Sequence, residues 1–415
     1  MKKGKKLLAL LVGVLMLATL AIGLAACGGG KEGTADVFWY DFADGFLSTV
    51  RAELDLRLGN MDVINHDAAG DAAEQKKQID TVISRGTDIL IVNVVNTSDT
   101  AGHQLIANAA KTAKIPLVFF NREIAQSVVD SYDDCVFVGT IAPEGGMKQG
   151  VMIGTYLLDP DNIVSGSSKF ANESDEIMYT ILRGEEGNNE AFFRSLYSVL
   201  VAQAMLEQAG TSWTLVNSTE LADKTEIAST DTGKFTALTE ADLTITLDEG
   251  TATEFVRVFT EEEAEDVLSH YIYGNWSQAE ANRLFGLAVN STNVDDKDVL
   301  GIIIANNDDQ ALGAIAHLKT LNYNRGGTNA SPFIPVFGVD ATDNAVKAIR
   351  NKEMVGSILQ SHVAMATALA QLAYNIAGGL ELKAHISVMY QFDEYDDFGV
   401  YVSPMIRIPY GIITK

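Results

Sequence analysis

Two observations predict an α/β fold of two lobes, each a doubly wound parallel sheet. From about residue 36, short apolar runs rich in β-branched and aromatic residues alternate with stretches of helical periodicity, which is the pattern of βαβ units. The runs are nearly continuous in apolar residues, as expected of parallel strands with helices over both faces. Two such series follow one another along the chain, which predicts two lobes of similar size with a crevice between them.

The first series contains five predicted strands and three predicted helices. We expect the strands at residues 37–40, 61–65, 89–95, 116–121 and 135–139. We expect the helices at residues 46–58, 75–85 and 104–113. In open parallel sheets ligands bind outside the carboxyl ends of the strands, so the residues just past each strand are the candidate binding residues.

The second series contains five more strands and six helices, and an acidic stretch interrupts it. We expect strands at 177–182, 213–216, 300–305, 334–339 and 355–359. We expect helices at 147–157, 189–208, 278–289, 310–321, 344–350 and 362–377. The interruption at about 219–273 is rich in Thr, Asp and Glu, and its short alternating pieces indicate a hairpin or a small surface subdomain. We interpret it as surface decoration in preference to a functional insertion.

Residues 1–26 have the pattern of an export signal. Four lysines within the first six residues precede an apolar run at 7–22, and small residues then lead to Cys27. This order is typical of a signal peptide and resembles a lipobox, in which the cysteine is lipidated; a plain cleaved signal or a membrane-spanning segment is the alternative. The glycine-rich residues 27–35 predict a flexible tether, so we expect contact with the membrane through the lipid anchor only.

Charge and cysteine content exclude several classes of function. The formal net charge is −25, and such an acidic body repels nucleic acid and anionic headgroups, so no nucleic-acid partner is expected. If Cys27 carries lipid, Cys135 is the only other cysteine, and no intramolecular disulfide is possible. Cys135 lies in an apolar run and is interpreted as a buried small hydrophobe. The six histidines show no ligand-like spacing, so no zinc site is predicted.

The common catalytic motifs are also missing. The sequence has no phosphate-binding loop, no HExxH and no GxSxG. Asp231-Thr232-Gly233 matches the aspartic-protease triplet, but it occurs once in a polar segment, and we interpret it as a turn. We therefore predict a binding protein that is not an enzyme and needs no cofactor.

Short polar side chains recur directly after several predicted strands, with aromatic residues beside them. The segments are 40–46, 119–123, 183–190 together with Arg194, 305–309 and 338–340. Amide and carboxylate groups can pair with vicinal hydroxyls, and flat aromatic faces suit the C–H surface of a polyol. For any single Asn or Asp, capping of the next helix is an equally good interpretation; the recurrence favours binding.

Six segments carry a resemblance to a known family, and they are PLVFFNRE (116–123), SYD (131–133), VGT (138–140), IANND (304–308), IPVFGVDA (334–341) and RIPY (407–410). They resemble the periplasmic galactose/glucose-binding proteins, the receptors of methyl-galactoside-type ABC importers, which have the type I periplasmic binding protein fold. The resemblance covers nearly the whole chain after the signal, except for residues 219–273.

The resemblance implies a ligand site between the lobes. It assigns the stacking faces to Phe46 and Trp276 and the hydroxyl-bonding groups to Asp44, Asn121, Arg194, Asn307 and Asp340. Three further positions depart from the family pattern, with Asn188 in place of His, Glu190 in place of Asp and Gln360 in place of Asn. These changes keep hydrogen-bonding capacity and alter reach and charge.

The departures leave the identity of the sugar open. The longer Glu190 could shrink the pocket and favour a pentose, or a rotamer change could absorb it, since Arg194 lies one helical turn along and can hold the carboxylate. Five matching positions favour an aldohexose, galactose or glucose.

The resemblance also bears on metal binding and on the lobe boundaries. Residues 159–166 lack the alternating Asp/Asn of the family's calcium loop, and Gly301 stands where the loop's distant carboxylate is expected, so we predict no calcium site. A three-stranded hinge is implied, with crossings near Thr140, 360–361 and 406–407. The lobes are then 36–140 with 361–406, and 141–360 with 407–415.

The implied function is that of an extracytoplasmic, lipid-anchored and monomeric sugar-binding protein that serves an ABC permease. The lobes close on the monosaccharide by hinge bending, and no bond is made or broken. Three alternatives stay open: a pentose- or signalling-furanose-binding protein of the same fold, a sugar-sensing partner of a chemoreceptor or kinase, and a lipoprotein hydrolase. For a hydrolase, the sequence offers no recognisable nucleophile–base pair.

Overall fold

The computed structural model describes residues 32–223, 238–247, 255–327, 332–384, 386, 391–392 and 405–414. The predicted signal peptide, Cys27 and the Asp231-Thr232-Gly233 triplet lie outside these residues. Within the described ranges, no helix has the length and apolar character needed to span a membrane.

The first lobe is built on a seven-stranded sheet with the order β16-β17-β5-β4-β3-β1-β2, in which only β16 runs antiparallel to its neighbour. Its strands are β1 (Thr34–Trp39), β2 (Asp62–Asp67), β3 (Ile89–Val92), β4 (Leu117–Phe120), β5 (Cys135–Gly139), β16 (Gln391–Phe392) and β17 (Met405–Arg407). Alternate side chains enter different cores, as the period-two geometry of a strand requires: Val37 and Trp39 pack on one face, and Phe38 packs on the other.

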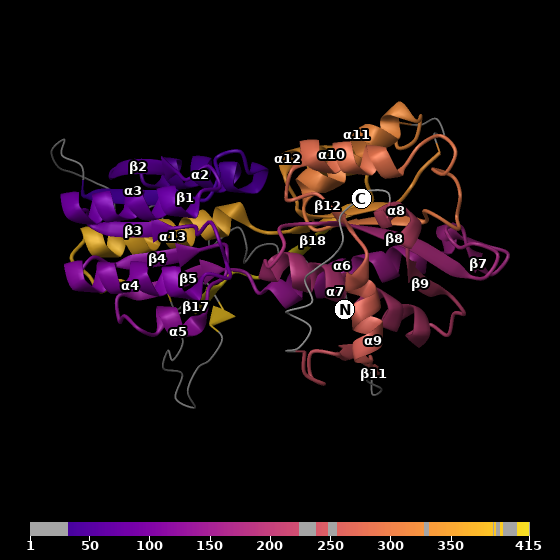
Figure 1. The fold of residues 1–415 in the computed structure, drawn as a ribbon, viewed down its shortest axis with the longest axis horizontal. Coiled ribbons are helices and arrows are strands. Elements are labelled where there is room, and N and C mark those ends of the chain that lie inside the picture. Colours follow the sequence, from indigo (N-terminus) through magenta and orange to yellow (C-terminus); the bar gives the residue numbers. More distant parts are fainter. Residues whose placement is uncertain are drawn as a thin grey trace, which may run out of the picture.

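Helices cover both faces of this sheet. On one face lie α2 (Gly45–Arg57) and α13 (His362–Ala377), and on the other lie α3 (Ala72–Arg85), α4 (Thr100–Ala113) and α5 (Gln126–Val129). Figure 1 shows the gold helix α13, from late in the chain, lying among the indigo and violet elements of the first lobe. Cys135 is buried in this lobe, and burial raises the pKa of its thiol to about 12, which confirms that it is a small core residue.

The second lobe has its own seven-stranded sheet with the order β12-β8-β13-β14-β15-β18, and β9 also pairs with β8. Its strands are β8 (Glu176–Arg183), β9 (Thr214–Asn217), β12 (Ile272–Tyr273), β13 (Ile302–Ala305), β14 (Val336–Asp340), β15 (Gly356–Leu359) and the antiparallel β18 (Gly411–Thr414). Helices α6 (Ala142–Leu157) and α7 (Asn189–Gln208) cover one face. The other face carries α10 (Gln278–Ala288), α11 (Asp308–Thr320) and α12 (Asp343–Arg350).

Close packing of α6 against α7 fixes the position of α7 within the second lobe. Three glycines at four-residue spacing on α6 face α7, and a Cβ at Gly146 would lie 2.4 Å from Phe193 O, and one at Gly150 2.6 Å from Val201 Cβ. Only glycine allows the helix backbones to approach this closely. The α7 N-terminus, which carries two of the predicted site residues, is thereby held in place.

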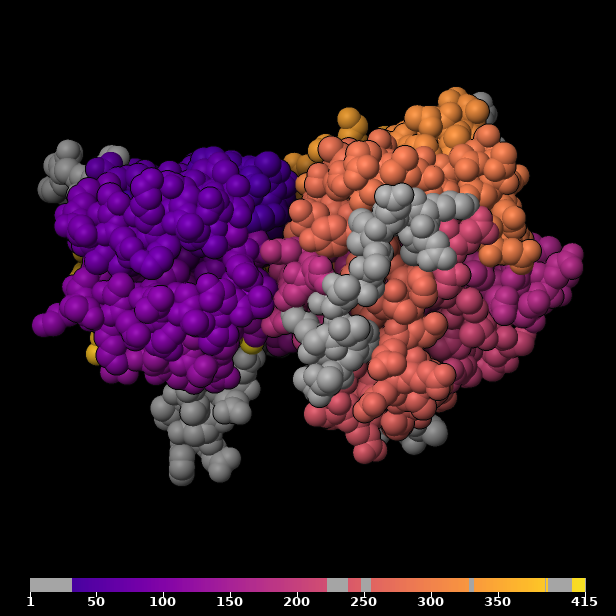
Figure 2. Space-filling model, viewed as in Figure 1, coloured from indigo at the N-terminus to yellow at the C-terminus, as the bar shows by residue number. Residues whose placement is uncertain are grey.

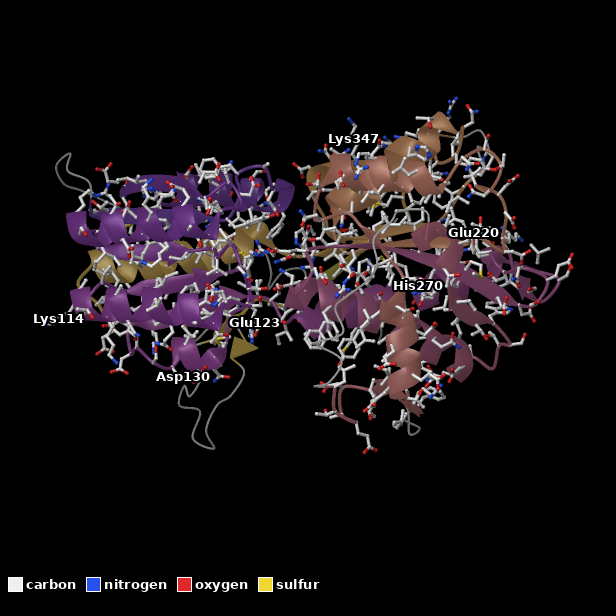
Figure 3. The ribbon with its side chains drawn as sticks, in the orientation of Figure 1. Lys114, Glu123, Asp130, Glu220, His270 and Lys347 are labelled. Atoms are coloured by element: carbon white, nitrogen blue, oxygen red, sulfur yellow. The ribbon has the colours of Figure 1, made fainter. Side chains whose placement is uncertain are left out.

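Within the residues that the structure describes, the chain passes between the two lobes three times. Passage 1 is 140–141 (between β5 and α6), passage 2 is 360–361 (between β15 and α13), and passage 3 is 408–410 (between β17 and β18). The side chain of Arg407 bonds the start of passage 1 by donating from Nη1 to Thr140 O (3.1 Å), and its Nη2 pairs with Glu123 (2.7 Å). Figure 3 places Glu123 on the side of the first lobe that faces the second. Passages 1 and 2 contain the predicted positions, whereas Arg407, predicted for the second lobe, lies in β17 of the first lobe. The lobe boundaries and the hinge stay predictions.

The acidic stretch at 219–273 contains more structure than its sequence indicated. Its described elements are α8 (Thr219–Asp223), the antiparallel hairpin β10 (Thr244–Leu247) and β11 (Phe255–Val258), α9 (Glu261–Ser269) and β12. Glu261, Glu262 and Glu263 form the first turn of α9, where negative charge suits the helix dipole. Thr260 and Glu263 make a capping box there. Val267 and Leu268 pack in the main core of the second lobe. Helix α9 thus contributes to the core of the second lobe. The predicted hairpin is present as β10 and β11, and the preference for decoration over a functional insertion stays a prediction.

Predicted and observed elements agree in type, and the differences lie at their ends. Helices α3 and α4 begin three or four residues earlier than expected because Asp71 and Asp99 cap them. The remaining short elements are η1 (Pro160–Asn162), β6 (Ile163–Val164) and β7 (Ser167–Ser168). Figure 2 shows the two lobes as separate bodies that meet along one boundary.

Candidate ligand-binding site

A cavity between the lobes collects the residues that follow the strands of both sheets. About 390 Å³ of empty space lies between its walls, part of which is open to solvent. All ten predicted ligand residues line it, together with two that the sequence did not assign to the site. The lining residues are Tyr40, Asp44, Phe46, Asn121, Arg122, Asn188, Glu190, Arg194, Trp276, Asn307, Asp340 and Gln360.

Three of these residues are also helix N-caps. The side chain of Asp44 accepts from Leu47 N, that of Asn188 from Ala191 N, and that of Asn307 from Gln310 N. Capping and cavity lining, which the sequence presented as alternatives, therefore coincide at these positions. A cap uses only part of an amide or carboxylate, and the strand–helix junction aims the rest at the cavity.

Backbone strain is concentrated in the cavity wall. Asn121 has φ 62°, Trp276 has φ 61° and Asp340 has φ 113°. Non-glycine residues rarely adopt positive φ, and such conformations cluster at functional sites. Because each of these side chains lines the cavity, the strained backbone serves to direct it there.

The two predicted stacking residues have different environments. Phe46 is 6% exposed and belongs to the first-lobe core, so it is a core residue as well as part of the wall. Trp276 is half-buried, and its indole lies directly on Gly184, where an added Cβ would be 2.3 Å from Trp276 Cζ2. Gly184 is thus required for the indole to reach its place.

Arg194 is held from several sides. Its Nη1 donates to Asn306 O (2.8 Å), and its Nη2 donates to Gln360 Oε1 (2.9 Å) and Tyr410 OH (3.0 Å). The carboxylate of Asp340 lies 3.9 Å from Nη1. Among the described residues, Arg194 Nε has no hydrogen-bond partner, so this N–H is available to a ligand.

Glu190 is buried without a hydrogen bond from its carboxylate to any other described residue. It is 6% exposed, and neither carboxylate oxygen has a partner in the described part of the chain. Burial raises its pKa, while Arg194 and Arg122 act electrostatically in the opposite direction. No hydrogen bond joins this carboxylate to Arg194, whose two Nη atoms donate to Asn306 O, Gln360 and Tyr410. Of the two alternatives for Glu190, the one in which Arg194 holds the carboxylate is therefore not seen as a hydrogen bond.

Tyr40 and Arg122 are the residues that sequence reasoning missed. Tyr40 OH donates to Asp44 Oδ2 (2.7 Å), and Arg122 Cζ lies 4.1 Å from the centre of the Tyr40 ring. Arg122, from the first lobe, also pairs with Glu185 of the second lobe. Tyr40 is the last residue of one predicted strand and Arg122 directly follows another, so both lie in segments that the sequence singled out. This position was the signal that could have identified them.

Carboxylates from both lobes meet across the cavity. Burial raises the pKa of Asp44 and Asp340, and it raises the pKa of Asp309 to about 6, with the nearby Asp44 charge adding to the effect. Desolvated carboxylates of this kind are stabilised by neighbouring cations or by donated hydrogen bonds. Arg122 and Arg194 supply the cations, and a ligand rich in O–H groups can supply the hydrogen bonds.

The family described as "Periplasmic binding protein domain" matches residues 36–381. The chain belongs to this family. Membership agrees with the predicted fold, and the related proteins are binding proteins and not enzymes, as the sequence predicts.

Relatives with known ligands share most of their length with this periplasmic binding protein. The D-galactose/methyl-galactoside binding periplasmic protein MglB of Haemophilus influenzae is 26% identical over 367 residues, which cover 87% of this chain and 86% of that protein. A Bacillus halodurans ABC transporter solute binding protein with bound myo-inositol has a TM-score of 0.56 and 20% identity, covering 94% of this chain and 96% of that one. A Clostridium phytofermentans counterpart with bound β-D-glucose has a TM-score of 0.59 and 15% identity, covering 92% and 94%.

The predicted absence of calcium concerns the loop before β8. Among the described residues, no group of three or more His, Cys, Asp or Glu side chains could hold a metal ion. Lys169 donates to the Asp161 carbonyl, so a cation already lies against this loop. A Cβ on Gly301 would lie 2.9 Å from both Met178 O and Phe170 O, which leaves no room for a carboxylate there.

We predict that removal of calcium leaves the stability of this periplasmic binding protein unchanged, because calcium needs roughly six to eight oxygen ligands. Melting temperatures measured with EDTA and with added calcium should agree. A fall in EDTA that calcium reverses would contradict the prediction.

The half-buried Trp276 allows the aromatic wall to be tested. Trp276→Ala should lower the affinity for sugar about tenfold or more, because the indole face is lost. The melting temperature of the ligand-free protein should change little. Calorimetric titration with a sugar that the wild type binds measures the first quantity, and thermal unfolding measures the second. Trp213→Ala is the matched control, because Trp213 is a core residue that is 4% exposed. This variant should have a lower melting temperature and an unchanged affinity for sugar. The opposite pattern in the two variants would show that Trp276 is a core residue.

Proposed function

We propose that this chain is the extracytoplasmic, monomeric sugar-binding component of an ABC importer, and that it binds an aldohexose, galactose or glucose, in the cavity between its lobes. The observation that carries the proposal is that several buried polar atoms of the cavity wall have no hydrogen-bond partner among the described residues. Acceptors and donors are both in this set: the two Glu190 oxygens, Arg194 Nε and Gln360 Nε2.

A sugar suits this combination because each hydroxyl can donate one hydrogen bond and accept others. Leaving such groups unpaired costs roughly 1–3 kcal/mol each, so a ligand that pairs all of them is strongly favoured over one that does not. The Trp276 face and the Phe46 edge of the core add apolar contact for the C–H surface of a pyranose ring. MglB of Haemophilus influenzae, by its name, binds D-galactose and methyl-galactoside, which agrees with this class of ligand.

One observation favours a second candidate, a pentose. Glu190 is a methylene longer than the residue that the resemblance implies, and it makes no hydrogen bond to Arg194 that would draw it aside. A carboxylate that extends into the cavity would fill part of the space of a hexose CH₂OH group. We favour the hexose because five positions, Asp44, Asn121 and Asn307 among them, match the pattern of the galactose/glucose-binding proteins.

The site can be tested with a sugar panel. We expect titration calorimetry with galactose, glucose, xylose, arabinose and ribose to show heat with at least one hexose and weaker or no binding of the pentoses. Tight binding of a pentose without heat from either hexose would replace the hexose assignment and keep the transport function. If none of the sugars binds, the proposed function itself fails.

The lipid anchor is part of the proposal. Its support is the order of basic residues, apolar run and small residues before Cys27. Expression of the full chain should place it in the membrane fraction, and Cys27→Ser should release it or leave an unprocessed precursor. Equal membrane association of the wild type and a processed Cys27→Ser chain would contradict lipidation.

A further inference from the structure

One buried hydroxyl connects the cavity to the passages between the lobes. Tyr410 lies in passage 3 and is 4% exposed. Its hydroxyl is 2.8 Å from Thr140 Oγ1, which belongs to passage 1, and it accepts a hydrogen bond from Arg194 Nη2 (3.0 Å). Tyr410 therefore touches two passages and a cavity residue at the same time.

Arg194 extends this connection to the remaining passage. The same Nη2 donates to Gln360 Oε1 (2.9 Å), and Gln360 is the first residue of passage 2. The guanidinium thus contacts passages 2 and 3 directly and reaches passage 1 through the Tyr410 hydroxyl. Charge-assisted hydrogen bonds between buried groups are stronger than ordinary ones, so the connection is a firm one.

The rest of Tyr410 is held by the second lobe and does not depend on this hydroxyl. Lys148 on α6 donates to the Tyr410 carbonyl, and the ring packs so closely that a Cβ on Gly145 would lie 3.0 Å from Tyr410 Cζ. A phenylalanine at this position would keep the ring packing. It would remove only the contacts with Thr140 and Arg194.

We infer that Tyr410 is a positioning residue for ligand binding: its hydroxyl holds the Arg194 guanidinium against the cavity and links it to all three passages between the lobes. Ligand contact with Arg194 and the relative placement of the lobes then depend on the same hydroxyl. The effect on affinity rests on the proposed function; the link between the passages does not, and it can be measured without ligand.

The first experiment compares Tyr410→Phe with a matched tyrosine variant. Tyr132 is a control of the same chemistry, because it is 7% exposed and its hydroxyl donates to Ile115 O (3.2 Å) within the first lobe, outside the cavity lining. We expect Tyr410→Phe to weaken hexose binding about tenfold, as loss of a buried hydrogen bond to a charged group predicts, whereas Tyr132→Phe keeps wild-type affinity. Wild-type affinity in Tyr410→Phe, or an equal loss in both variants, would overturn the positioning role.

Thr140→Val tests whether the bonds act as a unit. It removes the other partner of the Tyr410 hydroxyl and keeps the side-chain shape. We expect a smaller loss of affinity in Thr140→Val, and the double variant with Tyr410→Phe should bind like Tyr410→Phe alone. Additive losses would show that the two residues act independently and would contradict the linked arrangement.

Hydrogen exchange of the ligand-free protein tests the link without any sugar. In Tyr410→Phe, amides in peptides that cover 139–142 and 359–362 should exchange faster, as well as those that cover 407–411, while Tyr132→Phe leaves all three unchanged. A change confined to 407–411 would show that the passages are not linked through this hydroxyl. This result is independent of whether any sugar in the panel binds, so failure of the inference and failure of the proposed function can be told apart.

Discussion

A buried guanidinium between the lobes is the constraint on which the arrangement of the cavity depends. Arg194 is 4% exposed, and a buried charge must be compensated where it lies. Its partners are a carbonyl at the end of β13, an amide in passage 2, a phenol in passage 3 and the carboxylate that ends β14. Compensation of this one charge therefore brings together the ends of β13 and β14 and passages 2 and 3. These four segments surround Arg194 in the cavity wall.

The route by which Arg194 reaches this place begins far from the cavity. Helix α7 can approach α6 only because glycines on α6 leave space for its backbone. The side chain of Asn188 caps the same helix, and the first helical turn carries Glu190 into the cavity wall. The packing of α7 against α6 thus fixes the positions of both Glu190 and Arg194. A shift of α7 along its axis would move both side chains.

The acidic insertion contributes to the site through its last strand. Residues of α9 pack in the core of the second lobe, and β12 then pairs in parallel with the end of β8. The chain leaves β12 through the positive-φ residues Asn275 and Trp276, and the indole settles on Gly184 at the end of β8. The position of the aromatic wall therefore depends on a segment whose composition alone indicated decoration.

Local sequence determined the two α/β lobes, the order of their elements and the position of most cavity residues just past the strands. Hydrophobic periodicity and helix caps act over a few residues, and parallel strands bring their carboxyl ends to one edge, so Asp44, Asn188 and Asn307 could be placed from local pattern together with family resemblance. Only the tertiary structure decided that Phe46 belongs to the core, that Arg122 and Tyr40 join the wall, and that Arg194 bonds Gln360 and Tyr410 in place of Glu190. Each of these depends on burial and on which donors are already used by residues up to 216 positions away. A local pattern carries no information about such competition, because a hydrogen bond is assigned by proximity in space and not along the chain.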